Sequence, residues 1–391
     1  MVQTPLTTVG KRTEDRVARL HHTPELVIDL DQVGDAYAEM TAALPGITVH
    51  YATKCNPNPQ VLGRLMGLGS SFEIASAVEL ETLLEIGVEP AEVLYSNPVK
   101  PVSHIARAYA EGVRMFAFDS LDEVKKLADA APGTSAIVRL AAHDAPSAVP
   151  SEGKFGVDAR AAVELLLLAR EYGLDPYGVA FHVGSQMLDP KAWQAPLAVV
   201  GRILDELDEH GVRLRLVDLG GGFPARYATP VPPLAEYASV IHAGLAALPY
   251  QVDAAIEPGR AIVAAAGTLT ATVIGTALRG GKRWIHLDVG AFNGLMESLE
   301  TGNELRFPVR DSRASEALDR FHLTGPTCDS QDTIMFDVEL SADLATGDLV
   351  YIGSTGAYTT VYASTFNGFE IPAVRCVAQA AQGYRRPVVA A

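Results

Sequence analysis

Between residues 26 and 270, short apolar runs alternate with longer amphipathic stretches, and this alternation restricts the possible folds more than any other feature of the sequence. The longer stretches, such as 77–86, 121–130, 159–172, 193–210 and 234–248, have the spacing of apolar residues that is typical of helices. The short runs have the length and composition of buried strands, and they lie at residues 48–52, 72–75, 93–95, 115–118, 136–140, 178–182, 214–219 and 254–257. Eight strand-and-helix units predict an α/β fold with a closed (β/α)8 barrel of the TIM type.

After about residue 270 the pattern changes to segments rich in threonine and valine. Such segments occur at 268–274, 283–289 and 348–352, and turns rich in glycine and aspartate separate them. Branched side chains favour extended backbone, and turn residues mark the ends of strands. We therefore predict two domains, a barrel over residues 26–270 and a β-rich domain over residues 271–391.

Charge and cysteine content argue against several classes of protein. The 391-residue chain has 31 basic and 47 acidic side chains and a formal charge of −16, which argues against a nucleic acid or an anionic membrane as partner. Its three cysteines are far apart in the sequence, so we expect no disulfide framework. The first twenty residues lack the apolar core of a secretory signal, and no run reaches about 18 apolar residues. We expect a cytoplasmic protein that has no membrane segment and no metal site.

Polar and glycine-rich residues follow directly after four of the predicted strands. They are Lys54-Cys55-Asn56, His182-Val183-Gly184-Ser185, Gly220-Gly221-Gly222 and Glu257-Pro258-Gly259-Arg260. In a (β/α)8 barrel the carboxyl ends of all strands share one rim, and active sites are built at that rim. We therefore expect these residues to surround one pocket.

Lys54 and the three glycines suggest a site for a phosphorylated aldehyde. A lysine that ends a barrel strand points into the central site, where burial would lower the pKa of its amine and allow it to form a Schiff base. Three glycines in a row allow backbone N–H groups to surround an anion, and Arg260 suits a phosphate. The alternatives are a surface lysine, a simple tight turn, and an ion pair between Glu257 and Arg260.

His182 and the Cys328-Asp329 pair are further candidates, and each has a purely structural alternative. His182 could lie against an aromatic cofactor or exchange a proton, but a buried histidine is more often only hydrogen-bonded. Cys328 offers a thiol beside a carboxylate, whereas most isolated cysteines only pack. Together, a lysine, a phosphate loop, a histidine and a free carboxylate are the groups that pyridoxal 5'-phosphate requires.

Over nearly its whole length the chain resembles the barrel-type (fold type III) pyridoxal-phosphate decarboxylases of basic amino acids, and within them ornithine decarboxylase most closely. The resemblance implies an alanine-racemase-like barrel, pyridoxal phosphate as cofactor, and a C-terminal β-domain that residues 1–25 join. It is carried by the strings YATKCN, FEIAS, YSNPVK, FDS, KFGV, GVAFHVGSQ, LVDLGGGFP, IEPGRAIV, GPTCDSQD and GAYTTVYASTFNGF.

The resemblance also implies roles for individual residues. Lys54 is similar to the lysine that binds the cofactor, His182 to the histidine stacked on its ring, and Glu257 to the partner of its ring nitrogen. Three other residues match positions of the cofactor pocket, namely Arg139, Glu79 and Glu73, the last of which replaces an aspartate common in the animal enzymes. The implied phosphate ligands are Ser185, Gly220, Gly221, Gly222, Gly259, Arg260 and Tyr358.

Members of this family are head-to-tail homodimers in which the second subunit completes each active site. Cys328 and Asp329 match the pair that the second subunit contributes. Lys154 and Asp332 match positions that form an ion pair across the subunit boundary. The resemblance therefore implies an obligate homodimer with two shared sites.

Glu257 favours decarboxylation as the reaction. A carboxylate beside the pyridine nitrogen raises the pKa of that nitrogen and makes the ring a strong electron sink, whereas a barrel racemase typically has an arginine there. Loss of CO2 then leaves the α-carbon to be protonated, and Cys328 is the acid that we expect to do this.

The expected substrate-binding residues are Asp329, Glu297, Phe366 and Tyr358. A carboxylate at Asp329 suits the distal ammonium of L-ornithine or L-lysine, and we expect L-ornithine, as in polyamine synthesis. L-Lysine, or both, is the alternative, because one methylene discriminates by only about 1–3 kcal/mol. The string FNGLMESLE lacks the second aspartate of the animal enzymes, so Glu297 or Glu300 is the expected replacement. Diaminopimelate is disfavoured, since its decarboxylases usually carry glutamate after the cysteine.

Two other hypotheses stay open. The family includes catalytically inactive relatives that bind regulatory partners, but Lys54, Glu257 and Cys328 are all present here, which argues against that class. The same residues would also serve a decarboxylase of a modified, D-configured or carrier-bound amino acid.

Overall fold

Eight parallel strands close into a barrel in the order in which they occur in the sequence. The structure is a computed structural model that describes residues 22–141 and 153–378. The ring closes at β2, which pairs with β3 on one side and with β9 on the other. The barrel strands are β2 (Ile47–Ala52), β3 (Ser71–Ile74), β4 (Leu94–Tyr95), β5 (Met115–Phe118), β6 (Ser135–Arg139), β7 (Asp175–Ala180), β8 (Leu216–Asp218) and β9 (Asp253–Ile256). Each coincides with a predicted strand, so the predicted (β/α)8 barrel is confirmed.

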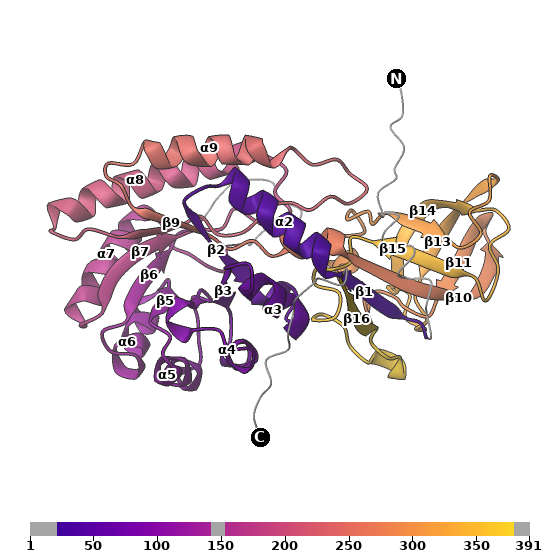
Figure 1. Cartoon of the computed structure of the whole chain (residues 1–391), viewed down its shortest axis with the longest axis horizontal. Helices are drawn as coiled ribbons and strands as arrows, with labels where there is room; N and C mark the ends of the chain where they lie inside the picture. Colours follow the sequence, from indigo (N-terminus) through magenta and orange to yellow (C-terminus); the bar gives the residue numbers. More distant parts are fainter. Residues whose placement is uncertain (1–21, 142–152, 379–391) are drawn as a thin grey trace.

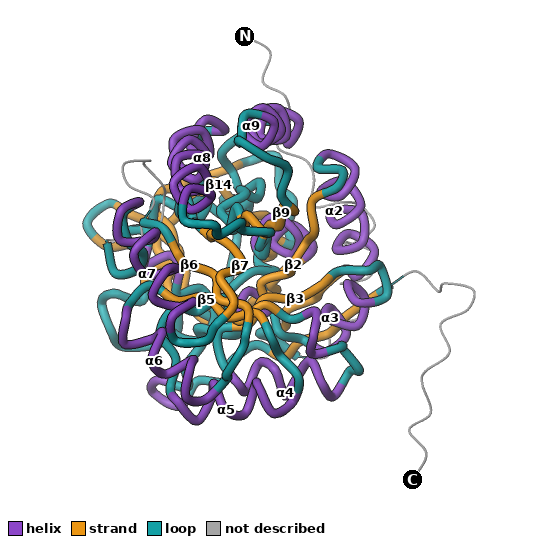
Figure 2. Tube along the Cα trace, turned by 90° about the vertical axis from the view of Figure 1, so that its left-hand side faces the viewer, coloured by secondary structure: helices purple, strands orange, loops and turns teal. Residues whose placement is uncertain are grey.

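Helices surround the barrel as an outer layer (Figure 2). Five of them begin at a side-chain cap. Ser76, Ser120 and Asp158, for example, each accept a hydrogen bond from the N–H group three residues further on. These caps fix the residue at which the chain leaves the rim and turns into a helix. The helices of this layer are α2 (Leu30–Ala43), α3 (Pro59–Met66), α4 (Ala77–Glu85), α5 (Val102–Glu111), α6 (Leu121–Ala130), α7 (Ala159–Glu171), α8 (Gln194–Glu209), α9 (Leu234–Ala246) and the short α10 (Arg260–Val263).

A small apolar cluster fills the inside of the barrel. It consists of Leu94, Ile137, Ala180, Leu216 and Ala255, which come from five different strands and are almost completely buried. Side chains alternate between the two faces of a strand, so these residues mark the inward face of each strand. The polar residues beyond the strand ends therefore lie above an apolar floor.

A mixed sheet forms the second domain, at the opposite end of the molecule from most of the barrel helices (Figure 1). Its long strand β10 (Gly267–Arg279) pairs with β1 (Glu25–Asp29), with β11 (Lys282–Leu287) and with β15 (Leu349–Gly353). The predicted β-rich second domain is confirmed. Its other elements are β12 (Val309–Asp311), β13 (Leu318–Thr324), β14 (Thr333–Ser341), β16 (Ala373–Val377) and the short helix α11 (Glu297–Glu300).

The predicted domain limits fall inside two strands of this sheet. β1 spans the limit at residue 26 and β10 spans the limit at residue 270, and the two strands pair with each other. The limits 26–270 and 271–391 therefore stay predictions. Of the N-terminal segment that we expect to join the sheet, residues 1–21 lie outside the described residues, while Thr23 bonds to Thr272 of β10 at 2.6 Å.

The described residues include no helix with the length and apolar composition needed to cross a bilayer.

Candidate active site

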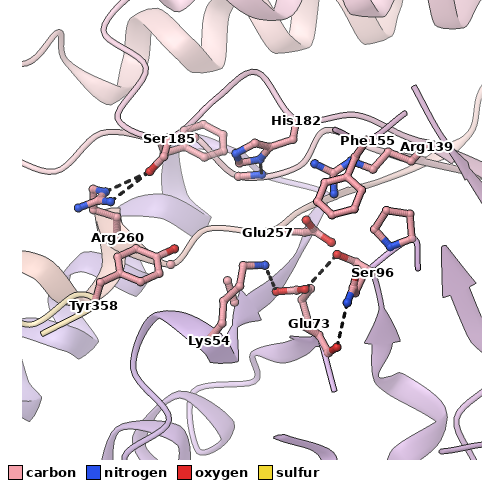
Figure 3. A pocket seen from close by; sticks show the side chains of 18 residues that line it. Lys54, Glu73, Ser96, Arg139, Phe155, His182, Ser185, Glu257, Arg260 and Tyr358 are labelled. Atoms are coloured by element: carbon pink, nitrogen blue, oxygen red, sulfur yellow. Dashed lines mark hydrogen bonds and ion pairs between the residues drawn. The ribbon is translucent and has the colours of Figure 1, made fainter. Parts of the chain in front are cut away.

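A cavity of about 340 Å³ opens at the carboxyl ends of the barrel strands, and 18 residues line it (Figure 3). The rim therefore brings together side chains that are up to 306 residues apart in sequence, from Ala52 to Tyr358. Among them are eleven of the predicted site residues, namely Lys54, Glu73, Arg139, His182, Ser185, Gly221, Gly222, Glu257, Gly259, Arg260 and Tyr358.

Lys54 lies in a short 3-10 turn (Thr53–Cys55) directly after β2, and its amine projects into the cavity. Its Nζ donates a hydrogen bond to Oε2 of Glu73 at 2.7 Å, while Oε1 of Glu73 accepts one from Oγ of Ser96 at 3.0 Å. The Glu73 side chain is 1% exposed and that of Lys54 is 44% exposed. A fixed carboxylate thus holds a lysine amine that remains accessible from the cavity.

The carboxylates around Lys54 reverse the expected shift of its pKa. Burial lowers the pKa of the amine, but the negative charges of Glu73, Glu257 and Glu79 raise it by more, so that it lies above its ordinary value. The net shift is therefore upward, and the expectation of a lowered pKa at Lys54 is wrong. Lys54 is a charged amine with a proton acceptor at hydrogen-bond distance.

Glu79 supports the site from outside the cavity. Its carboxylate accepts a hydrogen bond from the N–H of Ala75 at 2.6 Å, at the start of α4. Burial, followed by the charge of Glu73, raises the pKa of Glu79 to about 7. Glu79 is not among the residues that line the cavity, because its carboxylate turns back to the helix end, and its role in the cofactor pocket stays a prediction.

The three glycines make a close turn that a side chain would block. Gly220 and Gly222 have φ angles of +66° and +95°. A Cβ atom at Gly220 would lie 2.1 Å from the carbonyl oxygen of Phe181, and one at Gly222 would lie 2.5 Å from that of Gly184. Gly220 itself is not among the residues that line the cavity, whereas Gly221 and Gly222 are.

His182 is fixed by this loop. Its Nδ1 accepts a hydrogen bond from the N–H of Gly221 at 3.2 Å. Burial, followed by the charges of Arg139 and Lys54, lowers the pKa of His182 to about 3. The imidazole is therefore neutral at physiological pH, which suits a ring that packs against a flat group better than it suits a proton donor.

Arg260 is the centre of a buried polar cluster at one side of the cavity. Its guanidinium forms a two-point ion pair with Glu297, and both side chains are 5% exposed. It also donates to the hydroxyl of Tyr227 at 2.7 Å and to Oγ of Ser185 at 3.2 and 3.3 Å. Its ion-pair partner is thus Glu297, and Glu257 remains a separate carboxylate of the cavity.

Glu297, one of the predicted substrate-binding residues, belongs to this cluster. Its carboxylate pairs with Arg260, because a buried guanidinium requires a buried counter-charge, and its contact with the substrate stays a prediction. Glu300 lies one helical turn further along α11, and no residue of the described chain forms an ion pair with it.

Cys328, Asp329 and Phe366 lie in the second domain and not in the cavity of their own chain. Cys328 is exposed, and its Sγ lies 3.6 Å from Oδ1 of Asn367. Asp329 accepts a hydrogen bond from the N–H of Gln331 at 2.8 Å. Phe366 is 42% exposed and packs against Phe292. Their predicted roles stay predictions that require a second subunit.

Asp332 has a structural role inside its own chain. It is completely buried, and its carboxylate accepts hydrogen bonds from the N–H groups of Ala291 and Thr327 and from the Thr327 hydroxyl, at 2.7 to 3.0 Å. These donors already satisfy the charge, so the structure does not present Asp332 to a partner. Lys154 is exposed, and its Nζ lies 4.9 Å from the centre of the Phe155 ring. The ion pair between Lys154 and Asp332 stays a prediction.

Sequence reasoning did not single out four residues that matter here, namely Ser96, Phe155, Tyr227 and Asn97. Ser96 and Asn97 belong to the YSNPVK string and Phe155 to the KFGV string, so the resemblance contained a signal for three of them. Nothing in the sequence marks Tyr227, which bonds to Arg260 through the fold alone.

Comparisons with known proteins agree with this geometry. Residues 30–264 match the family described as pyridoxal-dependent decarboxylase, pyridoxal binding domain. The lysine/ornithine decarboxylase of Selenomonas ruminantium is 38% identical over 357 residues, which are 89% of this chain and 88% of that relative. The ornithine decarboxylase of Schizosaccharomyces pombe is 32% identical over 361 residues, 88% of this chain and 81% of that relative.

A solved structure shows the same fold with a cofactor bound. The crystal structure of SrLDC in complex with PLP and cadaverine has a TM-score of 0.85 to this chain and is 35% identical to it. The comparison covers 96% of this chain and 95% of that one.

Replacing Glu73 by glutamine should lower the pKa of the Lys54 amine. The substitution removes the nearest negative charge, so a larger fraction of the amine is neutral at a given pH and reacts with an aldehyde. The measurement is the rate of labelling of Lys54 by pyridoxal and borohydride as a function of pH, followed by mass spectrometry of the Lys54 peptide. We expect the midpoint of the variant to shift to lower pH. Glu81→Gln, on the exposed face of α4, is the control. An unchanged midpoint in Glu73→Gln would refute this electrostatic account.

Proposed function

The chain belongs to the pyridoxal-dependent decarboxylases, and on that premise we propose that it removes the α-carboxylate of L-ornithine to give putrescine and CO2. It is a pyridoxal-phosphate-dependent amino-acid decarboxylase, and its relatives act on basic amino acids. The observation that carries the proposal is the accessible Lys54 amine, held by Glu73 in one cavity with His182, Glu257 and the glycine loop.

L-Lysine is the second candidate substrate. It is supported by the name of the Selenomonas ruminantium relative, which includes both amino acids. A non-catalytic binding function has one relative in its favour, the antizyme inhibitor 2 of Xenopus laevis, which is 32% identical over 375 residues, but Lys54, Glu257 and Cys328 are all present in this chain.

The residues of the cavity fit pyridoxal phosphate. The close glycine turn leaves room that a Cβ atom would fill, and Ser185, Arg260 and Tyr358 lie around it, so this side of the cavity would hold the phosphate. The neutral ring of His182 would lie against the pyridine ring, and Glu257 would face the ring nitrogen. When bound, the cofactor supplies an electron sink for the electron pair that is released as the bond to the carboxylate breaks.

The protein's own part of the reaction consists of holding and moving protons. Lys54 must lose a proton before its nitrogen can bind an aldehyde carbon, and Glu73 accepts a hydrogen bond from it at 2.7 Å. At the end of the reaction a proton must be delivered to the α-carbon of the substrate. We propose that Cys328 of the partner subunit donates it, since Cys328 is exposed and does not reach the cavity of its own chain.

Glu300 is the residue that we propose for the distal ammonium of the substrate, together with Asp329 of the partner subunit. Burial and then the charge of Glu300 raise the pKa of Tyr362. Tyr362 in turn stacks on Tyr358, which lines the cavity, at 5.6 Å between ring centres. Glu300 is therefore the carboxylate of α11 that Arg260 does not use.

The first experiment identifies the product. The cofactor-loaded protein is incubated separately with L-ornithine, L-lysine, their D-forms and meso-diaminopimelate at matched concentrations, and amines are measured by mass spectrometry. We expect putrescine as the main product, and no product from a Lys54→Ala variant. Cadaverine as the main product would make L-lysine the preferred substrate. No amine from any of these substrates would refute the proposed activity.

Replacing Glu300 by glutamine should weaken substrate binding. A hydrogen bond to a charged group contributes about 1.5–3 kcal/mol, so we expect KM for L-ornithine to rise about 10-fold or more with little change in kcat. Glu297→Gln is the matched comparison one helical turn away, and it should weaken cofactor binding, because Arg260 loses its counter-charge. The assignment fails if KM rises in Glu297→Gln and is unchanged in Glu300→Gln.

Mixing two inactive variants tests whether the active site is shared between subunits. In a shared site, Lys54 comes from one subunit and Cys328 from the other. A dimer of one Lys54→Ala subunit and one Cys328→Ala subunit therefore has one site with both substitutions and one intact site. Random mixing of equal amounts should restore about a quarter of the wild-type rate. The measurement is the rate of putrescine formation after the variants are unfolded and refolded together. No recovery, with mixed dimers shown to form, would place Cys328 outside the shared site.

A further inference from the structure

The carboxyl groups of Asp218 and Glu257 interact at the ends of two neighbouring barrel strands, where Asp218 is buried and Glu257 lines the cavity. Asp218 is the last residue of β8 and is completely buried, and Glu257 follows the last residue of β9. Asp218 lies opposite Ala255 in the register of these two strands. Leu216 and Ala255 belong to the inner apolar cluster. Asp218 is two residues after Leu216, and Glu257 is two residues after Ala255, directly beyond the end of β9. Both carboxyl groups therefore point to the inside of the barrel.

One oxygen of each carboxyl group has no hydrogen-bond partner. Oδ1 of Asp218 accepts a hydrogen bond from the N–H of Gly220 at 2.9 Å. Oδ2 of Asp218 and Oε1 of Glu257 are both buried, and no donor of the described residues reaches either of them. Two buried acceptors without a donor are costly unless one of them carries a proton.

The charges around the pair oppose a second negative charge. Glu73 of β3 adds a third carboxylate nearby, and Lys54 is already paired with it. Arg139 at the end of β6 and the neutral His182 after β7 complete the ring of titratable groups that line this part of the cavity. Burial, followed by the charge of Glu257, raises the pKa of Asp218 well above its ordinary value.

We propose that Asp218 and Glu257 share one proton, with Asp218 as the carboxylic acid that donates a hydrogen bond to Oε1 of Glu257. Asp218 is then a positioning residue. It lets Glu257 carry a single negative charge although its Oε1 atom is buried, and it fixes the direction of the Glu257 carboxylate. Through Gly220 it also connects Glu257 to the glycine loop. The consequence for catalysis rests on the proposed role of Glu257 beside the ring nitrogen, whereas the shared proton rests on the contacts of these two residues.

The shared proton can be observed directly by infrared spectroscopy of the full chain at pH 8, with and without pyridoxal phosphate. The spectrum of the wild type minus that of Asp218→Asn should contain the carbonyl stretch of a protonated carboxylic acid. The spectrum of the wild type minus that of Glu257→Gln should contain the same band. In this variant the glutamine amide can donate a hydrogen bond to Asp218, which is then ionised. Asp311→Asn is the matched control, because Asp311 is buried in the second domain and accepts hydrogen bonds from Ser341. Absence of the band from the Asp218→Asn difference would overturn the proposal.

The pH dependence of stability gives a second, independent readout. An unfolded aspartate releases its proton near pH 3.9, whereas Asp218 keeps it in the folded protein. The wild type therefore loses stability as the pH rises above about 4, because only the unfolded chain releases this proton. Asparagine has no such proton, so Asp218→Asn lacks this contribution to the pH dependence. The melting temperature of Asp218→Asn minus that of the wild type should increase between pH 4 and pH 8, and a difference that does not change with pH would contradict the shared proton.

Cofactor affinity separates the positioning role from general damage. Asparagine retains an N–H donor toward Glu257, whereas leucine, which is branched at the same atom, has none. We expect Asp218→Asn to bind pyridoxal phosphate about as well as the wild type, and Asp218→Leu to bind it about 10-fold or more weakly, in titrations followed by absorbance. Equal affinity of both variants would refute the positioning role. If the infrared band is present but no substrate is decarboxylated, the proposed function fails and the shared proton stands.

Discussion

Closure of the eight-stranded barrel is the constraint on which the rest of the structure depends. The pairing of β2 with β9 joins residues that are about 200 positions apart and brings all eight strand ends to one rim. Lys54, His182, the glycine loop and Glu257 each follow a different strand, so none of them could form a site without this closure. The inner cluster of Leu94, Ile137, Ala180, Leu216 and Ala255 fills the barrel below the rim and leaves the polar residues at its open end.

At that rim two basic groups form ion pairs, in which each partner fixes the position of the other. Glu73 holds the Lys54 amine and Glu297 holds the Arg260 guanidinium, so the two basic groups have fixed positions before any ligand arrives. Within residues 22–141 and 153–378 no cation forms an ion pair with Glu257, which interacts with Asp218 instead. The site thus presents one accessible amine, one neutral imidazole and one carboxylate in fixed positions, which is the arrangement that a pyridoxal-phosphate enzyme needs.

The sequence predicted what depends on strand order and missed what depends on side-chain distances. All eight barrel strands, and the convergence of Lys54, His182 and Glu257, follow from periodicity and from the common rim. The sign of the pKa shift of Lys54 does not, because it depends on three carboxylates that approach from other strands and helices. The pairing of Glu297 with Arg260, which links α11 to α10, could not be predicted for the same reason. Neither could the hydrogen bonds to Asp332, since the sequence does not identify their donors. Strand β1 precedes the barrel in sequence yet pairs with β10 and β16, and local periodicity carries no information about such long-range pairing.

The central claim is that Lys54 is the residue through which the protein binds pyridoxal phosphate. The most direct test is to load the protein with the cofactor, reduce the complex with borohydride, digest it and locate the added mass by mass spectrometry. The account predicts a single phosphopyridoxyl group on the peptide that contains Lys54, and none at this position in Lys54→Ala. A phosphopyridoxyl group on another lysine of the wild type, or none at all after cofactor binding, would contradict it.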